Sequence, residues 1–199
     1  MDEYSVITVA WQYGSGGERL AVRLAERLGI PCCVKERGDV SDDWQISGQE
    51  RGEWLYLLAT GTEHGVCSSV APPLPPGEDR FFASCETIRR TAARGPCVIA
   101  SELGEFALRE RKDRISIFIC ADRGYRRRTI ERDEGLSSAE AVGRLEKADR
   151  RQRSEYGFYT GERWDALDRY ALCVNVSALG EERTVALMED VIKRGVGGE

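Results

Sequence analysis

A buried-strand pattern followed at once by a glycine-rich turn and an amphipathic helix constrains the fold more than any other feature of this sequence. Residues Val6–Ala10 are nearly all apolar and β-branched, which is typical of a strand covered on both faces in a parallel sheet. The glycine loop Tyr13–Gly17 follows. Leucines and alanines then recur at helical spacing over residues 18–29, and Gly29 is a suitable helix stop. The chain therefore begins with a strand, a glycine loop and a helix.

Strand and helix patterns alternate along the rest of the chain. Strand patterns occupy residues 30–34, 97–100, 115–121 and 172–176, and helical patterns occupy residues 81–94, 104–111, 138–156 and 181–194. Such alternation predicts a three-layer α/β fold, a parallel sheet with helices on both faces. A length of 199 residues suits one domain, so we expect a single domain over residues 1–199.

Two segments differ in composition from the rest. Residues 36–80 are acidic, carry four prolines within Pro72–Pro76 and offer one helical candidate, residues 53–59. A connection this long in a compact domain is more often a binding loop than core, so we expect an insert. Residues 122–163 are rich in arginine, and composition alone favours a solvated helical pair laced with ion pairs.

Composition and charge exclude several classes of protein. A composition of 41% hydrophobic and 32% charged residues is typical of a globular protein, and the longest apolar runs are too short to span a bilayer. The acidic start Met1–Tyr4 lacks the pattern of a secretory signal, so we expect a cytoplasmic protein. A net charge of -5 argues against general nucleic-acid binding.

The seven cysteines predict neither a disulfide framework nor a zinc site. Their number is odd and no C-x-x-C pair occurs, while His64 is the single histidine. We expect reduced, mostly buried thiols and no protein metal centre.

The glycine loop is suited to a phosphate, because backbone N–H groups there lie at the positive end of a helix dipole. Its match to the pattern G-x-x-x-x-G-K-[ST] is incomplete. If Gly17 takes the last glycine, Gln12 replaces the first glycine, Glu18 the lysine and Arg19 the hydroxyl residue. From the motif alone, either the loop binds phosphate with charge from Arg19, or it is a tight turn that packs the helix on the sheet.

The chain resembles a known family at several points. Ile7–Gly17 and Leu24–Pro31 are similar to the opening of the cytidylate-kinase-like proteins, a bacterial branch of the P-loop nucleoside monophosphate kinases. Further similar segments follow in the family's order: Arg94–Ile99, Glu134–Ser137, Lys147–Arg151, Tyr159–Gly161, Trp164 and Asn175–Gly180. Residues 36–80 lack a clear counterpart.

This resemblance implies a five-stranded parallel sheet of order 2-3-1-4-5, ATP phosphates over the first loop with Mg²⁺ between them, an acceptor-side insert at 36–80 and an arginine-bearing lid at 122–163. The expected donor-binding residues are Gly14, Ser15, Gly16, Gly17, Glu18 and Arg19. The expected catalytic cations are Arg19, Arg126, Arg132, Arg150 and Arg151. The expected acceptor-side residues are Lys35, Ser84, Ser101, Glu102 and Glu105.

Two departures from the family reverse a charge where an anion is expected. The family's Arg-Glu after the glycines is inverted to Glu18-Arg19, and its Gly-Arg pair after the third strand is replaced by Ser101-Glu102. An acid facing a phosphate at about 4 Å costs roughly 4 kcal/mol at an effective dielectric near 20. A small change of turn could point Arg19 inward and Glu18 outward. Glu102 has no such alternative, but its carboxylate is able to bind Mg²⁺ or a ligand hydroxyl or amine.

The implied function is ATP-dependent phosphoryl transfer to a nucleoside monophosphate or a related small acceptor, with no nucleic-acid or membrane partner and the oligomeric state left open. One alternative is a catalytically impaired nucleotide-binding or partner-binding protein on the same fold. The other is a kinase for a non-nucleotide small molecule, which the divergent insert favours.

Overall fold

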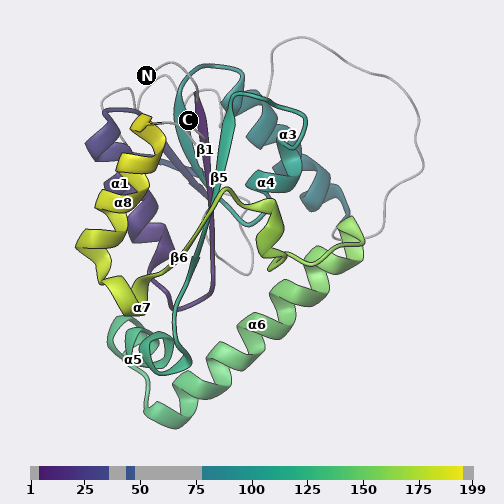
Figure 1. Cartoon of the computed structure of the whole chain (residues 1–199). Helices are drawn as coiled ribbons and strands as arrows, with labels where there is room; N and C mark the ends of the chain where they lie inside the picture. Colours follow the sequence, from purple (N-terminus) through teal and green to yellow (C-terminus); the bar gives the residue numbers. More distant parts are fainter. Residues whose placement is uncertain (1–4, 36–43, 48–77, 195–199) are drawn as a thin grey trace.

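The computed structural model describes residues 5–35, 44–47 and 78–194. Within these ranges, one sheet contains six strands in the order β3-β2-β4-β1-β5-β6 (Figure 1). The strands are β1 (Val6–Trp11), β2 (Cys32–Lys35), β3 (Trp44–Ser47), β4 (Cys97–Ala100), β5 (Arg114–Cys120) and β6 (Leu172–Asn175). Neighbouring strands are parallel except β2 and β3, which pair antiparallel.

The parallel part of the sheet confirms the order 2-3-1-4-5, because the five expected strands are β1, β2, β4, β5 and β6. The antiparallel edge strand β3 was not expected, since the sequence offered only a helical candidate within residues 36–80. Unlike the wholly apolar run Cys97–Ala100, Trp44–Ser47 mixes polar and apolar residues inside an acidic segment, so it does not stand out as a strand. The helical candidate at 53–59 lies outside the described residues.

The helices are α1 (Gly17–Leu28), α3 (Glu78–Ala92), α4 (Gly104–Ala107), α5 (Arg123–Glu134), α6 (Ser138–Thr160), α7 (Val176–Leu179) and α8 (Glu181–Arg194), with a 3-10 turn at Leu167–Arg169. Helix α4 is shorter than the expected 104–111, and α6 extends four residues beyond the expected end at 156. A capping box at Ser137 and Glu140 starts α6, because the two residues satisfy each other's backbone N–H groups.

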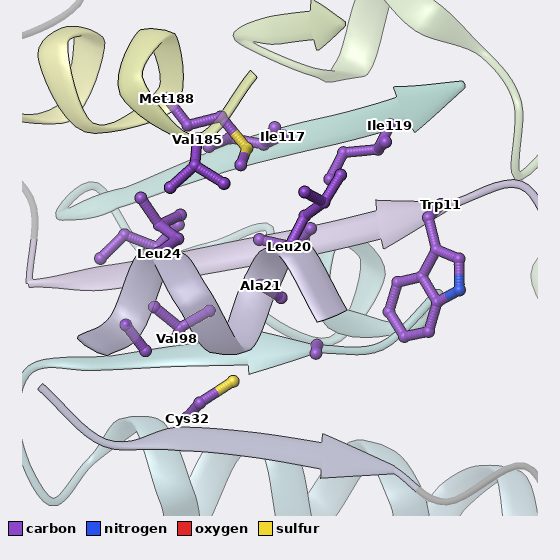
Figure 2. Close-up of a cluster of buried hydrophobic side chains, with 14 of the residues drawn as sticks. Trp11, Leu20, Ala21, Leu24, Cys32, Val98, Ile117, Ile119, Val185 and Met188 are labelled. Carbon is purple, nitrogen blue, oxygen red and sulfur yellow. The ribbon is translucent and has the colours of Figure 1, made fainter. Parts of the chain in front are cut away.

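Helices α1 and α8 cover one face of the sheet. Figure 2 shows Leu20 and Leu24 of α1 and Met188 of α8 packed over the strands, where all three are fully buried. The opposite face carries α3 and α4 and an aromatic cluster in which Trp164 and Tyr170 pack on Phe118. Burial of apolar side chains on both faces is the main source of stability for this layered arrangement.

The ends of β1 and β4 define the place where a ligand is expected. These strands are neighbours, yet α1 follows β1 on one face and α4 follows β4 on the other. In open α/β sheets, ligands bind outside the carboxyl ends of the strands at such a switch point. Helix α6 crosses this end of the sheet from α5 toward α3 (Figure 1).

In the part of the chain that the structure describes, no helix has both the length and the apolar character needed to cross a bilayer.

Candidate functional site

The glycine loop turns sharply between β1 and α1. Gly14 and Gly16 have φ angles of 78° and 77°, which side chains other than glycine rarely adopt. The N–H of Ser15 donates to the carbonyl oxygen of Gln12 at 3.0 Å, and the twelve-residue helix α1 begins at Gly17. The loop therefore presents the amino end of a full helix at the switch point.

The hydroxyl of Ser15 fits a site for a bound oxyanion. Ser15 is fully buried, and its Oγ has no hydrogen-bond partner among the described residues. An unpaired buried hydroxyl costs about 1–3 kcal/mol, so native proteins seldom leave one without a ligand or water. Together with the α1 amino end, it favours the phosphate-binding alternative for this loop over a packing turn.

Gly17 is required by a close approach of β1 to α1. A Cβ atom at this position would lie 2.2 Å from the Cβ of Trp11, far inside van der Waals contact. The first residue of α1 therefore accommodates no side chain while Trp11 keeps its place.

Arg19 is directed back toward the loop. Its Nη2 would lie 2.9 Å from a Cβ placed on Gly16. The guanidinium is held by Glu181 of α8 at 2.7 Å and by Asp133 of α5 at 3.3 Å, and the hydrogen bond to Glu181 raises the pKa of Arg19 above its ordinary value. Glu18 is exposed to solvent. Arg19 is thus near the loop, but it is already paired with two carboxylates.

A cavity of about 460 Å³ opens beside the loop, between α1 and α5. Its lining residues are Trp11, Tyr13, Gly14, Gly16, Gly17, Glu18, Arg19, Val22, Arg23, Thr129, Ile130, Asp133 and Glu134. Five of the six expected donor-binding residues therefore line one cavity, and Ser15 lies buried in the same loop.

Helix α5 packs directly on the loop. A Cβ on Gly14 would meet the carbonyl oxygen of Arg126 at 2.8 Å and the side chain of Ile130 at 3.0 Å. The buried Arg126 side chain donates from Nε to the carbonyl oxygen of Tyr13 at 2.6 Å and pairs with Asp149 of α6. Arg126 therefore connects α5, α6 and the loop.

The hydroxyl of Tyr13 adds a second connection between the loop and the helical pair. It donates a hydrogen bond to Glu134 and accepts one from Arg144 at 3.4 Å. Burial is the main cause that raises the pKa of Tyr13 above its ordinary value. The loop is therefore held at both its backbone and its tyrosine side chain.

The other three expected lid arginines lie at the surface. Arg132 pairs with Asp133 at 2.8 Å, Arg151 pairs with Glu155 at 2.7 Å, and Arg150 is 3.9 Å from Glu146. Of the four arginines expected in a lid, only Arg126 contacts the glycine loop in this arrangement.

On the acceptor side, Ser101 lies at the switch point, where its N–H donates to the carbonyl oxygen of Val9 at 3.0 Å. Glu102 is partly exposed and makes no ion pair or side-chain hydrogen bond within the described residues. Ser84 is buried in α3, and Lys35 is the last residue of β2.

Glu105 faces the interior. It is buried, with carboxylate oxygens 3.4 Å from Arg114 and 3.9 Å from Arg169. One of its oxygens, Oε2, has no hydrogen-bond partner among the described residues. This carboxylate lies within an ion-pair network.

Several residues of the site have no motif that singles them out. Asp133 and Asp149 lie within a run of alternating charges, and Glu181 begins a helix more than 160 residues after Arg19. Among the described residues, no three or more histidine, cysteine or acidic side chains gather as metal ligands.

A family model described as the cytidylate kinase-like family matches residues 6–178. The chain belongs to the cytidylate kinase-like family. The match includes the glycine loop, the switch point and the whole of α5 and α6. Among curated proteins, no significant match was found.

Solved structures share the fold of this family member. An uncharacterized protein from Eubacterium ventriosum has a TM-score of 0.71 at 20% identity, covering 96% of this chain and 99% of that one. A gluconokinase from Sinorhizobium meliloti has a TM-score of 0.56 at 15% identity, covering 98% and 94%. A shikimate kinase from Bacteroides thetaiotaomicron has a TM-score of 0.54 at 12% identity, covering 94% and 98%. At these identities the likeness establishes a P-loop kinase fold and nothing finer.

Proposed function

We propose that this protein transfers a phosphoryl group from ATP to a small acceptor, of which nucleoside monophosphates are the class that the family resemblance implies. The observation that carries the proposal is Ser15, whose buried hydroxyl has no partner at the amino end of α1. The glycine loop would bind the donor phosphates through backbone N–H groups and this hydroxyl, with Arg19 beside them.

The same site is suited to Mg²⁺, which the oxygens of the bound phosphates would coordinate. When bound, it would neutralise charge between the donor phosphates. The hydroxyl oxygen of Ser15 is the loop group suited to it, and the remaining positions would be taken by phosphate oxygens and water, as Mg²⁺ prefers. No cluster of carboxylates is needed for this mode of binding.

The helical pair α5–α6 would act as the lid over the phosphates. Phosphoryl transfer depends mainly on positioning and neutralisation of charge, so arginines are the side chains suited to the task. Arg126 already contacts the loop. Arg132, Arg150 and Arg151 would approach the phosphates only if this helical pair changes position, which would also exclude water.

Calorimetry with ATP and ADP, paired with an ADP-release assay over several acceptors, tests the proposal. The variant Ser15→Ala should weaken ATP binding several-fold at unchanged stability, because the hydroxyl has no partner to lose. Ser137→Ala is the matched control: it removes the α6 cap, costs about 1 kcal/mol and should leave ATP affinity unchanged. No nucleotide binding by the unaltered protein would refute the proposal.

A binding protein without turnover is the second candidate. It is favoured by the carboxylates that already hold Arg19 and Arg126, because both cations would have to exchange partners to reach a phosphate. Nucleotide binding without ADP release for any acceptor would select this alternative.

A further inference from the structure

Helix α6 bridges the two sides of the switch point. On the β1 side, Asp149 holds Arg126, which in turn donates to the carbonyl oxygen of Tyr13. On the β4 side, the ring of Tyr156 lies 6.3 Å from that of Phe106 in α4, edge to face. Asp149 and Tyr156 are seven residues apart, about 10 Å along the helix axis. The inner face of α6 between them therefore covers the junction of β1 and β4.

Gln152 lies in the middle of this bridge. It follows Asp149 by three residues and precedes Tyr156 by four, so all three share one helix face. Its Nε2 is buried and has no hydrogen-bond partner among the described residues. Gln152 thus offers an unused amide donor at the switch point, and Ser15, also buried and unpaired, lies in the loop on the β1 side.

Glu102 contributes a negative charge on the β4 side. Its neighbours Ser101 and Leu103 are buried, whereas Glu102 itself is partly exposed and unpaired within the described residues. Three buried or half-buried arginines have other partners: Arg114 and Arg169 pair with Glu105, and Arg126 pairs with Asp149. Across this junction the described residues present a free carboxylate and a neutral amide.

Such a set of groups disfavours a phosphate monoester and suits hydroxyl groups. A carboxylate accepts hydrogen bonds from hydroxyls but repels a second anion, and an amide N–H donates to a neutral oxygen. We propose that the acceptor is an uncharged, hydroxyl-bearing compound, such as a polyol, sugar or nucleoside, with Glu102 and Gln152 as its specificity-determining residues. This inference rests on the proposed phosphoryl transfer, and it replaces the nucleoside monophosphate that the family resemblance implies with an uncharged acceptor.

The corresponding transfer is balanced without a further reactant. The acceptor oxygen forms a bond to the γ-phosphorus of ATP as the bond from that phosphorus to the bridging oxygen of ADP breaks. The electron pair of that bond leaves with ADP, and the hydroxyl proton passes to the Glu102 carboxylate, which then returns it to water.

Cytidine and CMP are a matched pair of probes, because they differ only in the phosphate. Binding of each is measured by calorimetry to the full-length protein saturated with ADP. The unaltered protein should bind CMP no more tightly than cytidine, and Glu102→Arg should raise CMP affinity at least tenfold without raising cytidine affinity. Glu102→Gln, which is less disruptive, should give a smaller rise in the same direction. Glu110→Arg makes the same charge change on the exposed connection that follows α4, near the opposite end of the sheet, and should change neither affinity.

The acceptor class and the phosphoryl transfer itself are tested by different results. If the unaltered protein binds CMP more tightly than cytidine, or releases ADP fastest with CMP, the acceptor class is wrong while phosphoryl transfer stands. If neither probe binds the unaltered protein, a CMP affinity gained in Glu102→Arg supports the inference, and no gain in either Glu102 variant overturns it. Absence of ADP binding refutes the proposed function itself.

Gln152→Leu provides an independent test. Because its amide nitrogen has no partner, the melting temperature should stay the same or rise, while KM for an uncharged acceptor, or cytidine affinity where no acceptor turns over, weakens several-fold. ATP affinity should not change. A lower melting temperature with unchanged acceptor binding would make Gln152 a structural residue and overturn its proposed role.

Discussion

Arg126 and Asp149 face each other through two hydrogen bonds, of 3.1 Å from Nη1 and 2.5 Å from Nη2, while Nε of the same guanidinium donates to the carbonyl oxygen of Tyr13. The Arg126 side chain is only 6% exposed. Asp149→Ala should therefore destabilise the protein by about 3 kcal/mol, because removal of one partner leaves a buried charge uncompensated. The free energy of unfolding in urea measures the effect.

Glu146→Ala is the control for this prediction. Glu146 lies on the same helix and pairs with Arg123, but Arg123 is 64% exposed and Glu146 42% exposed. Ion pairs of that kind contribute about 0–1 kcal/mol. Equal losses of unfolding free energy in the two variants would show that the buried pair of Arg126 and Asp149 holds α5 and α6 to the loop no better than an exposed pair.

Local patterns predict the strand, the glycine loop and the helix that follows it, because each depends on neighbours in sequence. The direction of Arg19 does not follow from such patterns. Its guanidinium is fixed by Asp133 and Glu181, which are 114 and 162 residues away in the chain. The sequence predicts Arg19 beside the glycine loop, but only the packing of α5 and α8 reveals the carboxylates that hold it.

The direction of Glu105 and the presence of β3 likewise do not follow from local sequence patterns. A glutamate shortly after a buried strand is expected near the switch point, yet α4 turns Glu105 inward to Arg114 and Arg169. The resemblance to a family predicted the sheet order. Strand β3 pairs with β2, and the mixed polar and apolar residues Trp44–Ser47 do not predict that pairing. In both cases the deciding contact joins segments that are not adjacent in sequence, which local patterns do not reveal.

Gly17→Ala should destabilise the protein by several kcal/mol, because the new Cβ would lie 2.2 Å from the Cβ of Trp11. Trp11→Ala keeps that Cβ, so the double variant should recover little, whereas Trp11→Gly should recover part of the loss. Thermal unfolding measures all three.

Gly143→Ala, in the second turn of α6, is the matched glycine control. Nothing lies within 4 Å of a Cβ at that position, so the substitution should stabilise the protein by up to about 1 kcal/mol through helix propensity. A Gly17→Ala variant as stable as Gly143→Ala would contradict the close approach of β1 to α1.

The ionisation of Glu162 makes the stability of the folded protein depend on pH. Hydrogen bonds from Arg169 and Arg109 lower the pKa of Glu162 to about 2 from an ordinary value near 4.5. Between these values the unfolded chain binds more protons than the folded one, so stability falls as pH falls through this window. The free energy of unfolding in urea should exceed that of Glu162→Gln at pH 7, and the excess should become smaller at pH 4 and smaller still at pH 3. A constant difference would mean that Glu162 is not ionised in this pairing.

The buried thiols should resist alkylation. Burial raises the pKa of Cys97 to about 12, and Cys97 is fully buried on β4, whereas Cys173 lies exposed on β6. Because the thiolate is the reactive form, iodoacetamide at pH 8 should modify Cys97 at least about tenfold more slowly than Cys173. Mass spectrometry of peptides over time measures both, and denaturant should remove the difference. Equal rates in the folded protein would contradict the burial of Cys97.

Release of Arg19 from its carboxylates should strengthen nucleotide binding. Glu181 is its nearer partner, at 2.7 Å, so Glu181→Gln weakens the competition for the guanidinium and should lower the Kd of ATP roughly three- to tenfold. Arg19→Ala should raise the Kd instead. Glu182→Gln is the control, because Glu182 pairs with Arg23 and Arg27 rather than with Arg19. Calorimetry with ATP measures all three variants. If Glu181→Gln weakens binding as Arg19→Ala does, the carboxylate orients Arg19 toward the phosphates rather than withholding it, and the resting ion pair is part of the binding site.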